Sequence, residues 1–205
     1  MQRPEDFRPL TCNPDLRLYS PRLELRPLRM DDCGPRYLAW LENPAIHAWL
    51  ETRWQPQSLD SIRSFVAAIN DDPCSLLFGM LRAADQRHIG NIKLGPINPI
   101  HSCADISYFI GERDAWGQGF ATEAIRAVVD FAFQHLALHR VQAGCYADNV
   151  GSMRALEKVG FQREGVWRQQ LRVDAADTSS WQDHLWFGIL ADEWPRAQSG
   201  QQGPQ

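Results

Sequence analysis

The strongest constraint on the fold is a strand, a turn with two glycines and a helix, followed by another strand. The segments 104–110 and 140–146 are apolar and read as buried strands. Between them, Gly117 and Gly119 lie at a turn, and apolar residues recur with helical spacing over 121–136. Two strands joined by a helix form a crossover and run parallel in one sheet. We therefore expect a protein of the α/β class.

Further elements are expected on both sides of this unit. The patterns predict seven strands, over 23–27, 75–82, 89–94, 103–110, 140–146, 166–173 and 180–190. Helices are expected from a cap at Asp31 or Asp32 to just before Pro44, after Ser58 or Asp60, and ahead of Gly160. The last two strands should form an antiparallel hairpin. The fold class is then a mixed α/β sheet with helices on both faces.

The chain has 205 residues, enough for one sizeable core. Three prolines and few periodic apolar residues suggest a loose N-terminal arm over 1–19. One domain is expected over 20–195. Polar residues rich in Gly and Gln predict a disordered tail over 196–205.

Charge and cysteine usage exclude several classes of function. The net charge is −4 and basic residues are dispersed, which argues against nucleic acid as a partner. No apolar run reaches the roughly 20 residues that span a membrane, so no membrane partner is expected. The cysteines at 12, 33, 74, 103 and 145 are far apart and make no metal-ligand spacing. Reduced thiols and no metal are expected, in a cytoplasmic protein.

The two glycines have a chemical use. Without a Cβ they let the main chain approach a ligand closely, and the helix that follows opens with free N–H groups suited to a pyrophosphate. A P-loop is a poor reading, because no Lys-Ser or Lys-Thr follows the glycines. A Rossmann site is also a poor reading, since the later G-x-x-G spacing and the ribose carboxylate are missing.

Several motifs in order support one resemblance. They are Leu23-Glu24-Leu25-Arg26-Pro27-Leu28, Asp105-Ile106-Ser107-Tyr108, Trp116-Gly117-Gln118-Gly119-Phe120-Ala121-Thr122-Glu123-Ala124, His139-Arg140-Val141, Asn149-x-x-Ser152, Glu157-Lys158-Val159-Gly160-Phe161 and Glu164-Gly165. Over roughly 20–195 the chain resembles the GNAT superfamily of acetyltransferases. More closely, it is similar to the branch with the ribosomal-protein N-terminal alanine and serine acetyltransferases.

The resemblance implies a GNAT fold, with a mostly antiparallel seven-stranded sheet splayed between strands 4 and 5. It implies acetyl-CoA as cosubstrate and a primary amine as acceptor, most plausibly a peptide or protein N-terminal α-amine, acetylated by direct transfer. Two alternatives stay open: a small-molecule amine acetyltransferase acting on an antibiotic, polyamine or amino acid, and a catalytically silent CoA-binding sensor. A monomer or homodimer fits either case.

The resemblance also assigns the CoA-binding residues. They are Phe109, Ile110, Arg113, Trp116, Gly117, Gln118, Gly119, Phe120, Ala121, Thr122, Asn149, Ser152 and Lys158. The glycine turn would bind pyrophosphate through its N–H groups, and strand residues near Phe109, Ile110 and Gly111 would pair with pantetheine. Asp114 departs from the family's Gln or Arg and would repel phosphates unless it points away. Arg113 is then expected to supply the positive charge.

Three residues are the catalytic candidates. Ser152 is expected to protonate the CoA sulfur, because many relatives use a tyrosine where this chain has Leu156. An ordinary helix-start role for Ser152 weighs about equally. Asp105 and Glu164 are candidate bases, each with a surface ion pair as the alternative reading, and Glu112 is a further carboxylate. Cys145 has no evident His–Asp partner, which disfavours an acyl-enzyme.

The acceptor side is less defined. In relatives the first helical region lines the acceptor cleft, and here it contains Trp40, Trp49 and Trp54. Trp167, Trp181 and Trp186 on the last strands could form the opposite wall. Most of these tryptophans should nevertheless pack in the core or on the sheet.

Overall fold

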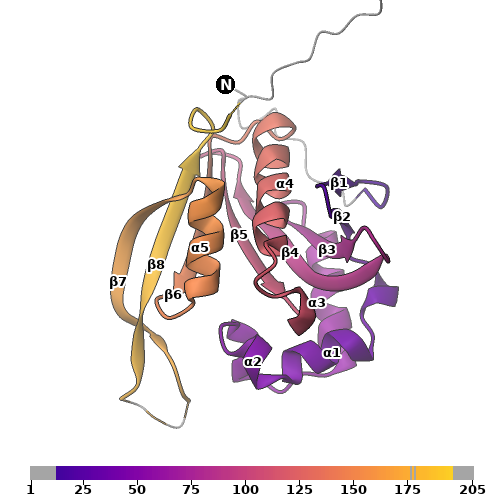
Figure 1. Cartoon of the computed structure of the whole chain (residues 1–205), viewed down its shortest axis with the longest axis vertical. Helices are drawn as coiled ribbons and strands as arrows, with labels where there is room; N and C mark the ends of the chain where they lie inside the picture. The colour runs from indigo at the N-terminus through magenta and orange to yellow at the C-terminus, as the bar shows by residue number, and fades with distance from the viewer. Residues whose placement is uncertain (1–12, 176, 178, 196–205) are drawn as a thin grey trace, which may run out of the picture.

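A computed structural model describes residues 13–175, 177 and 179–195. Its sheet has eight strands in the order β1-β2-β3-β4-β5-β6-β8-β7 (Figure 1). The strands are β1 (Leu18–Tyr19), β2 (Leu23–Pro27), β3 (Leu76–Arg82), β4 (Arg87–Asn98), β5 (Cys103–Ile110), β6 (Arg140–Tyr146), β7 (Gln162–Arg172) and β8 (Trp181–Leu190). The helices are α1 (Pro35–Glu42), α2 (Pro44–His47), α3 (Leu59–Asp71), α4 (Phe120–Gln134) and α5 (Val150–Val159), with short 3₁₀ turns η2 (Met30–Asp32), η3 (Glu51–Trp54) and η4 (Arg113–Ala115).

One pair of strands is parallel, and it separates along its length. β5 and β6 pair only from Cys103 opposite Arg140 to Asp105 opposite Gln142. Beyond Asp105 both strands continue without pairing, and the sheet opens into a wedge. All other neighbouring strands are antiparallel. The expected mixed sheet, splayed between its fourth and fifth predicted strands, is confirmed.

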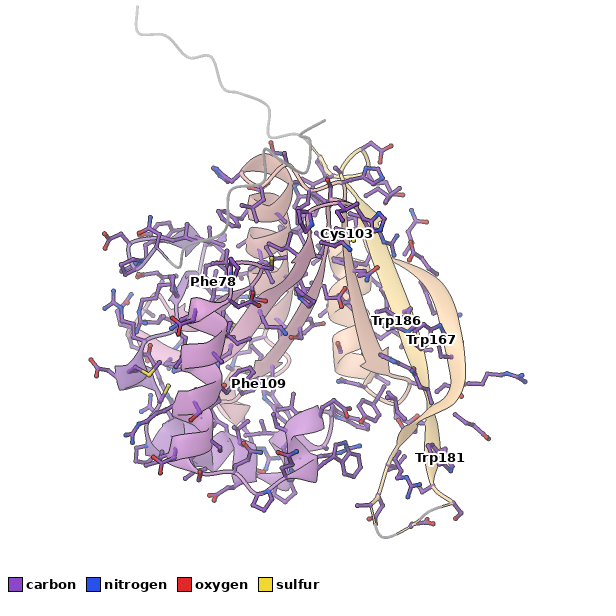
Figure 2. The ribbon with its side chains drawn as sticks, turned by 180° about the vertical axis from the view of Figure 1, so that it is seen from behind. Phe78, Cys103, Phe109, Trp167, Trp181 and Trp186 are labelled. Carbon is purple, nitrogen blue, oxygen red and sulfur yellow. The ribbon has the colours of Figure 1, made fainter. Side chains whose placement is uncertain are left out.

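Helices cover both faces of the sheet, as expected. α4 and α5 lie side by side on one face, where Ile125, Val128 and Leu156 belong to the larger core (Figure 1). α1 and α3 cover the other face, where Tyr37 and Val66 form a second core. In Figure 2, Phe109 lies where the sheet meets this second layer. The two cores lie on opposite sides of β5, so one strand presents residues to both.

Local signals explain most helix ends. Ser58 caps α3, accepting a hydrogen bond from the Ser61 N–H at 3.1 Å. Gly160 closes α5 in the left-handed conformation that glycine tolerates best. The expected cap of α1 at Asp31 or Asp32 was wrong. Both residues lie in η2, and α1 begins at Pro35 after Gly34, because proline fits the first helical position.

The strand count also differs from the expected seven. The additional strand, β1, has only two residues and lies within the segment expected to be a loose arm. β4 and β7 also extend beyond their expected ranges. Residues 1–12 of the arm and the expected disordered tail, 196–205, lie outside the described residues. Within the described residues, no helix combines the length and apolar character needed to cross a bilayer.

Candidate active site at the opening between β5 and β6

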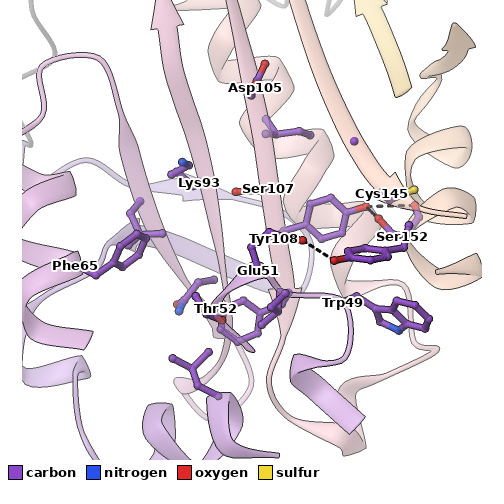
Figure 3. Close-up of a pocket in the computed structure, with 18 of the residues that line it drawn as sticks. Trp49, Glu51, Thr52, Phe65, Lys93, Asp105, Ser107, Tyr108, Cys145 and Ser152 are labelled. Carbon is purple, nitrogen blue, oxygen red and sulfur yellow. Dashed lines mark hydrogen bonds between the residues drawn. The ribbon is translucent and has the colours of Figure 1, made fainter. Parts of the chain in front are cut away.

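A cavity of about 850 Å³ lies where β5 and β6 separate (Figure 3). Its lining includes residues of both strands, of the start of α5, of β4 and β8, of α1 and α3, and of the segment between α2 and α3. This volume lies within the range of about 300–1,000 Å³ that is common for small-molecule sites. The splay of the sheet therefore creates a site that reaches both of its faces.

Strand alternation divides the lining residues between the two faces. Tyr108 packs with the core under α4 and α5, on the same side as Cys145 of β6. Phe109 packs with the core under α1 and α3, and Asp105 shares its face by alternation. A ligand in the gap would thus meet Tyr108 from one side and Asp105 from the other.

Ser152 and Tyr108 form a hydroxyl pair on the α5 side. The Ser152 Oγ lies 2.8 Å from the Tyr108 hydroxyl, and either can donate (Figure 3). The Tyr108 hydroxyl also donates to the Ser152 carbonyl oxygen at 3.2 Å. Burial raises the pKa of Tyr108, so its hydroxyl keeps its proton at neutral pH. Sequence analysis assigned no catalytic role to the Tyr108 side chain. The side-chain alternation along 105–108 was the signal that could have placed it opposite Asp105.

Asn149 is the N-cap of α5. Its Oδ1 accepts a hydrogen bond from the Ser152 N–H at 3.1 Å. This bond fixes the first turn of the helix and with it the position of the Ser152 hydroxyl. Asn149 also lines the cavity.

Asp105 lines the opposite part of the cavity and is partly buried. Its Oδ1 accepts a hydrogen bond from Gln142 Nε2 at 2.6 Å. These two residues are the last paired positions of β5 and β6. The carboxylate therefore lies at the point where the gap begins.

Both glycines of the turn have a left-handed backbone conformation. Gly117 has φ +71° and Gly119 has φ +85°, in the left-handed region that favours glycine. Gly119 is the N-cap of α4. Within the described part of the chain, none of the main-chain N–H groups of residues 117–122 donates to a protein acceptor. These free donors at the positive end of a 15-residue helix suit a diphosphate.

Asp114 is turned away from this turn. Its carboxylate accepts a hydrogen bond from Arg87 Nη1 at 3.1 Å and lies 3.8 Å from Arg82 Nη1. Both arginines belong to β3 and β4. The repulsion anticipated between Asp114 and a bound phosphate is thereby reduced. Arg113 is exposed, and its guanidinium lies 5.7 Å from the Trp116 ring centroid.

The family model described as "Acetyltransferase (GNAT) domain" matches residues 22–162. That range covers the splayed strands, the glycine turn and α5, and it is more than half of the chain. The chain belongs to the GNAT acetyltransferase family.

Relatives and a solved structure agree with this assignment. "Probable N-acetyltransferase YjcK" of Bacillus subtilis is 42% identical over 114 residues, which cover 55% of this chain and 60% of that protein. The "[Ribosomal protein uS5]-alanine N-acetyltransferase" of Escherichia coli is 23% identical over 70% of this chain and 72% of its own length. "Mycobacterium smegmatis RimJ in complex with CoA-disulfide" superposes with a TM-score of 0.73 at 26% identity, covering 90% of this chain and 91% of that one. The predicted resemblance to the GNAT superfamily is confirmed.

In this GNAT chain the edge of β5 that faces the gap is partly occupied. The Gly111 N–H donates to Ile89 O of the neighbouring segment at 2.8 Å, so it is not free for pantetheine. The Ile110 carbonyl accepts from Trp116 Nε1 at 2.9 Å, which ties the glycine turn to the end of β5. By alternation, the N–H groups of Tyr108 and Ile110 point toward the gap. Of the residues expected to pair with pantetheine, Gly111 therefore has no free N–H, whereas the Ile110 N–H faces the gap.

The other two candidate carboxylates are engaged by arginines. Glu164 accepts from Arg140 Nη1 at 2.7 Å and from Nη2 of the same guanidinium, and it is not among the residues that line the cavity. The Arg140 hydrogen bonds lower the pKa of Glu164, the opposite of what a base needs at neutral pH. Glu112 accepts from Trp40 Nε1 at 3.2 Å and from Arg87.

Lys158, one of the residues expected to bind CoA, is exposed in the last turn of α5.

The 3₁₀ turn η3 crosses the open end of the wedge, a feature that sequence reasoning missed. Glu51 accepts from the Tyr146 hydroxyl of β6 at 2.6 Å (Figure 3). Arg53 Nη2 donates to the same hydroxyl at 3.0 Å and to the Arg172 carbonyl of β7 at 2.8 Å. Burial, and then the bond to Glu51, raise the pKa of Tyr146. η3 therefore joins the α1–α3 side of the molecule to the β6–β8 side.

The tryptophans match the expected division between packing and the acceptor cleft only in part. Trp49 and Trp186 line the cavity from opposite sides. Trp40 is buried in the second core, and Trp54 packs against the Arg53 guanidinium. Trp167 and Trp181 are exposed on β7 and β8, outside the cavity lining (Figure 2).

Cys145 lines the cavity beside Ser152 but is a poor nucleophile. Burial raises the pKa of its thiol to about 11, so the thiol is protonated at neutral pH. No cluster of three or more potential metal ligands occurs among the residues that the structure describes.

Proposed function

We propose that this chain is an acetyl-CoA-dependent N-acetyltransferase that transfers an acetyl group directly to a primary amine. The observation that carries the proposal is the wedge between β5 and β6, which ends on the Ser152–Tyr108 pair on one face and on Asp105 on the other. Family membership and the CoA-containing structural neighbour support the choice of cosubstrate.

The glycine turn would hold the cosubstrate. The free N–H groups of residues 117–122 would bind its diphosphate, and Asn149 would contact the pantetheine arm in the gap. Acetyl-CoA supplies an activated acetyl thioester. A gap-facing N–H of Tyr108 or Ile110 would then stabilise the developing oxyanion, an effect typically worth about 3 kcal/mol per donor.

Proton transfers would be divided between the two faces. Asp105 would accept the amine proton, directly or through a water, because it lies on the face opposite the hydroxyl pair. Ser152 would donate a proton or hydrogen bond to the leaving sulfur and regain any transferred proton from solvent, while Tyr108 would hold the Ser152 hydroxyl in place through their 2.8 Å contact. Glu164 has no part in this scheme, because Arg140 holds its carboxylate outside the cavity.

The acceptor class follows less directly. A peptide or protein N-terminal α-amine is proposed first, because one relative is named a ribosomal-protein alanine N-acetyltransferase. An α-amine has a pKa near 8 and needs less help from a base than a lysine amine. A small-molecule amine is the second candidate. The bonds of η3 to Tyr146 and Arg172 favour it, because they join segments on the two sides of the cavity and would restrict the approach of a protein chain there.

Two measurements test the proposal. Calorimetric titration with acetyl-CoA should give saturable binding, and free thiol should appear only when an amine pool is added. Pools of free-N-terminus peptides, N-blocked lysine peptides, polyamines and aminoglycosides separate the acceptor classes. Lack of saturable binding would overturn the proposal. Binding without turnover on any pool would instead support a CoA-binding sensor.

A further inference from the structure

The charged residues in the acceptor part of the cavity are not all of one sign. Glu51 and Asp105 are acidic, whereas Lys93 of β4 is basic and partly buried (Figure 3). Both carboxylates already accept hydrogen bonds from protein donors: Asp105 from Gln142, and Glu51 from Tyr146 and Trp54. This cavity is therefore not a simple acidic pocket for a polycation.

Lys93 has no counterion at contact distance. Among the described residues, no carboxylate lies within the 4 Å of an ion pair with its ammonium group. The more distant Asp72 is committed elsewhere. Hydrogen bonds from the Ser75 hydroxyl and the Cys74 N–H lower the pKa of Asp72, and the charge of Lys93 only adds to them. A partly desolvated ammonium without a close partner is unfavourable unless a ligand supplies one.

Lys93 is placed next to the reacting groups. It is paired with Ser107 across β4 and β5, and Asp105 is the next residue of β5 on the same face. Diagonal neighbours of this kind have Cα atoms about 7–8 Å apart, within reach of a lysine side chain. An amine at Asp105 would thus bring its own neighbouring atoms under the Lys93 ammonium.

We infer that the acceptor carries a carboxylate close to its primary amine, and that Lys93 binds this carboxylate. This inference rests on the proposed transferase function and names its substrate class. Two sources share the chemistry: a free α-amino acid, and a peptide N-terminus followed by an acidic residue. Polyamines and aminoglycosides, whose charged groups are all positive, would be repelled by Lys93 and are disfavoured.

The experiment compares matched amines that differ by one carboxylate. The amino-acid arm uses L-phenylalanine against 2-phenylethylamine, with glutamate, aspartate and leucine and their decarboxylated amines in parallel. The peptide arm uses Ala-Asp-Phe-amide against Ala-Asn-Phe-amide. Acetyl-CoA affinity is measured separately by calorimetry, and kcat/KM is measured by thiol release.

In at least one arm we expect the carboxylate-bearing member to have a kcat/KM higher by about tenfold or more, as a charge-assisted hydrogen bond permits. Lys93→Met should reduce that preference to less than about threefold by raising the acceptor KM, while the acetyl-CoA Kd stays unchanged. Lys93→Arg should restore most of it. Arg63→Met is the matched control, because Arg63 is an exposed residue of α3 whose one ion pair with a described residue is with Asp60.

The outcomes separate this inference from the proposed function. If acetyl-CoA does not bind, the proposed function fails and the inference fails with it. If acetyl-CoA binds and amines are acetylated equally well with and without the carboxylate, the transferase function stands and the inference is wrong. Acetyl-CoA binding without turnover of any carboxylate-bearing acceptor, or a carboxylate preference that survives in Lys93→Met, also overturns it.

Discussion

The Tyr108 hydroxyl lies 2.8 Å from the Ser152 Oγ, although the two residues are 44 positions apart in the chain. Tyr108 reaches across from β5, and Ser152 is held by its own N–H on the Asn149 cap of α5. The pair closes the α5 side of the wedge. It also supplies a hydroxyl network in a chain whose Leu156 cannot donate a proton.

Removing the Ser152 hydroxyl should impair turnover more than binding. We expect Ser152→Ala to lower kcat by about 100-fold, within the range of general acid catalysis, with little change in the acetyl-CoA Kd. Tyr108→Phe should lower kcat by about tenfold, because it removes one hydrogen bond from the donor. Steady-state kinetics and calorimetry check both. An unchanged kcat in Ser152→Ala would mean that Ser152 has only a structural role at the start of the helix.

A side chain at the glycine turn should abolish CoA binding. Gly119 has φ +85°, which costs an L-residue about 1–2 kcal/mol, and Glu at this position adds a negative charge beside the free N–H groups. Gly119→Glu should show no saturable heat with CoA. Gly165→Glu is the control, since a Cβ there meets open space and the residue lies on β7, outside the glycine turn. Equal CoA affinity in the two variants would mean that the glycine turn does not bind CoA.

Asp114 lies near the expected phosphate site, but its orientation predicts that its negative charge has little effect on CoA binding. Its carboxylate is already held by Arg87 on the protein surface. Asp114→Asn should therefore change the CoA Kd by less than about threefold and stability by roughly 0–1 kcal/mol, as for other exposed ion pairs. An increase in CoA affinity of tenfold or more in Asp114→Asn would mean that the carboxylate faces the ligand.

Glu164 should affect stability and not catalysis. Its pKa is lowered in the folded state by Arg140, so its contribution is present above the ordinary glutamate pKa of about 4.3 and is lost as pH falls through the lowered value. With the side chain 40% exposed, Glu164→Gln should cost only about 0–1 kcal/mol at pH 7. Denaturant unfolding from pH 7 to pH 3 should show the difference shrinking as pH falls. A large drop in kcat of Glu164→Gln at pH 7 would instead mean that Glu164 acts as a base.

Local patterns in the sequence were sufficient for most of the elements. The strand over 103–110, the glycine turn and α4 were predicted because their signals lie within a few residues of one another. β1 was missed, since two residues carry no periodicity. The start of α1 was misplaced, because Pro35 takes the first helical position and Gly34, not Asp31 or Asp32, is the N-cap.

The site was predicted only in part. Ser152, Asn149 and Asp105 were named on the basis of the family resemblance, and all three line the cavity. Nothing near Asp114 in the sequence indicates that it turns toward Arg87 of another strand. The link between η3 and β6 likewise depends on the hydrogen bond from Tyr146 to Glu51, two residues 95 positions apart.

By itself, the sequence determined the order of most strands and helices and the glycine turn, because these depend on short-range sterics, capping and periodicity, and its motifs indicated the family. The tertiary structure alone decided which polar groups face one another across the wedge. The contact of Tyr108 with Ser152, and the absence of a described carboxylate within ion-pair distance of Lys93, both follow from how the sheet separates and what packs against it. Such contacts join residues far apart in the chain, so no local rule encodes them.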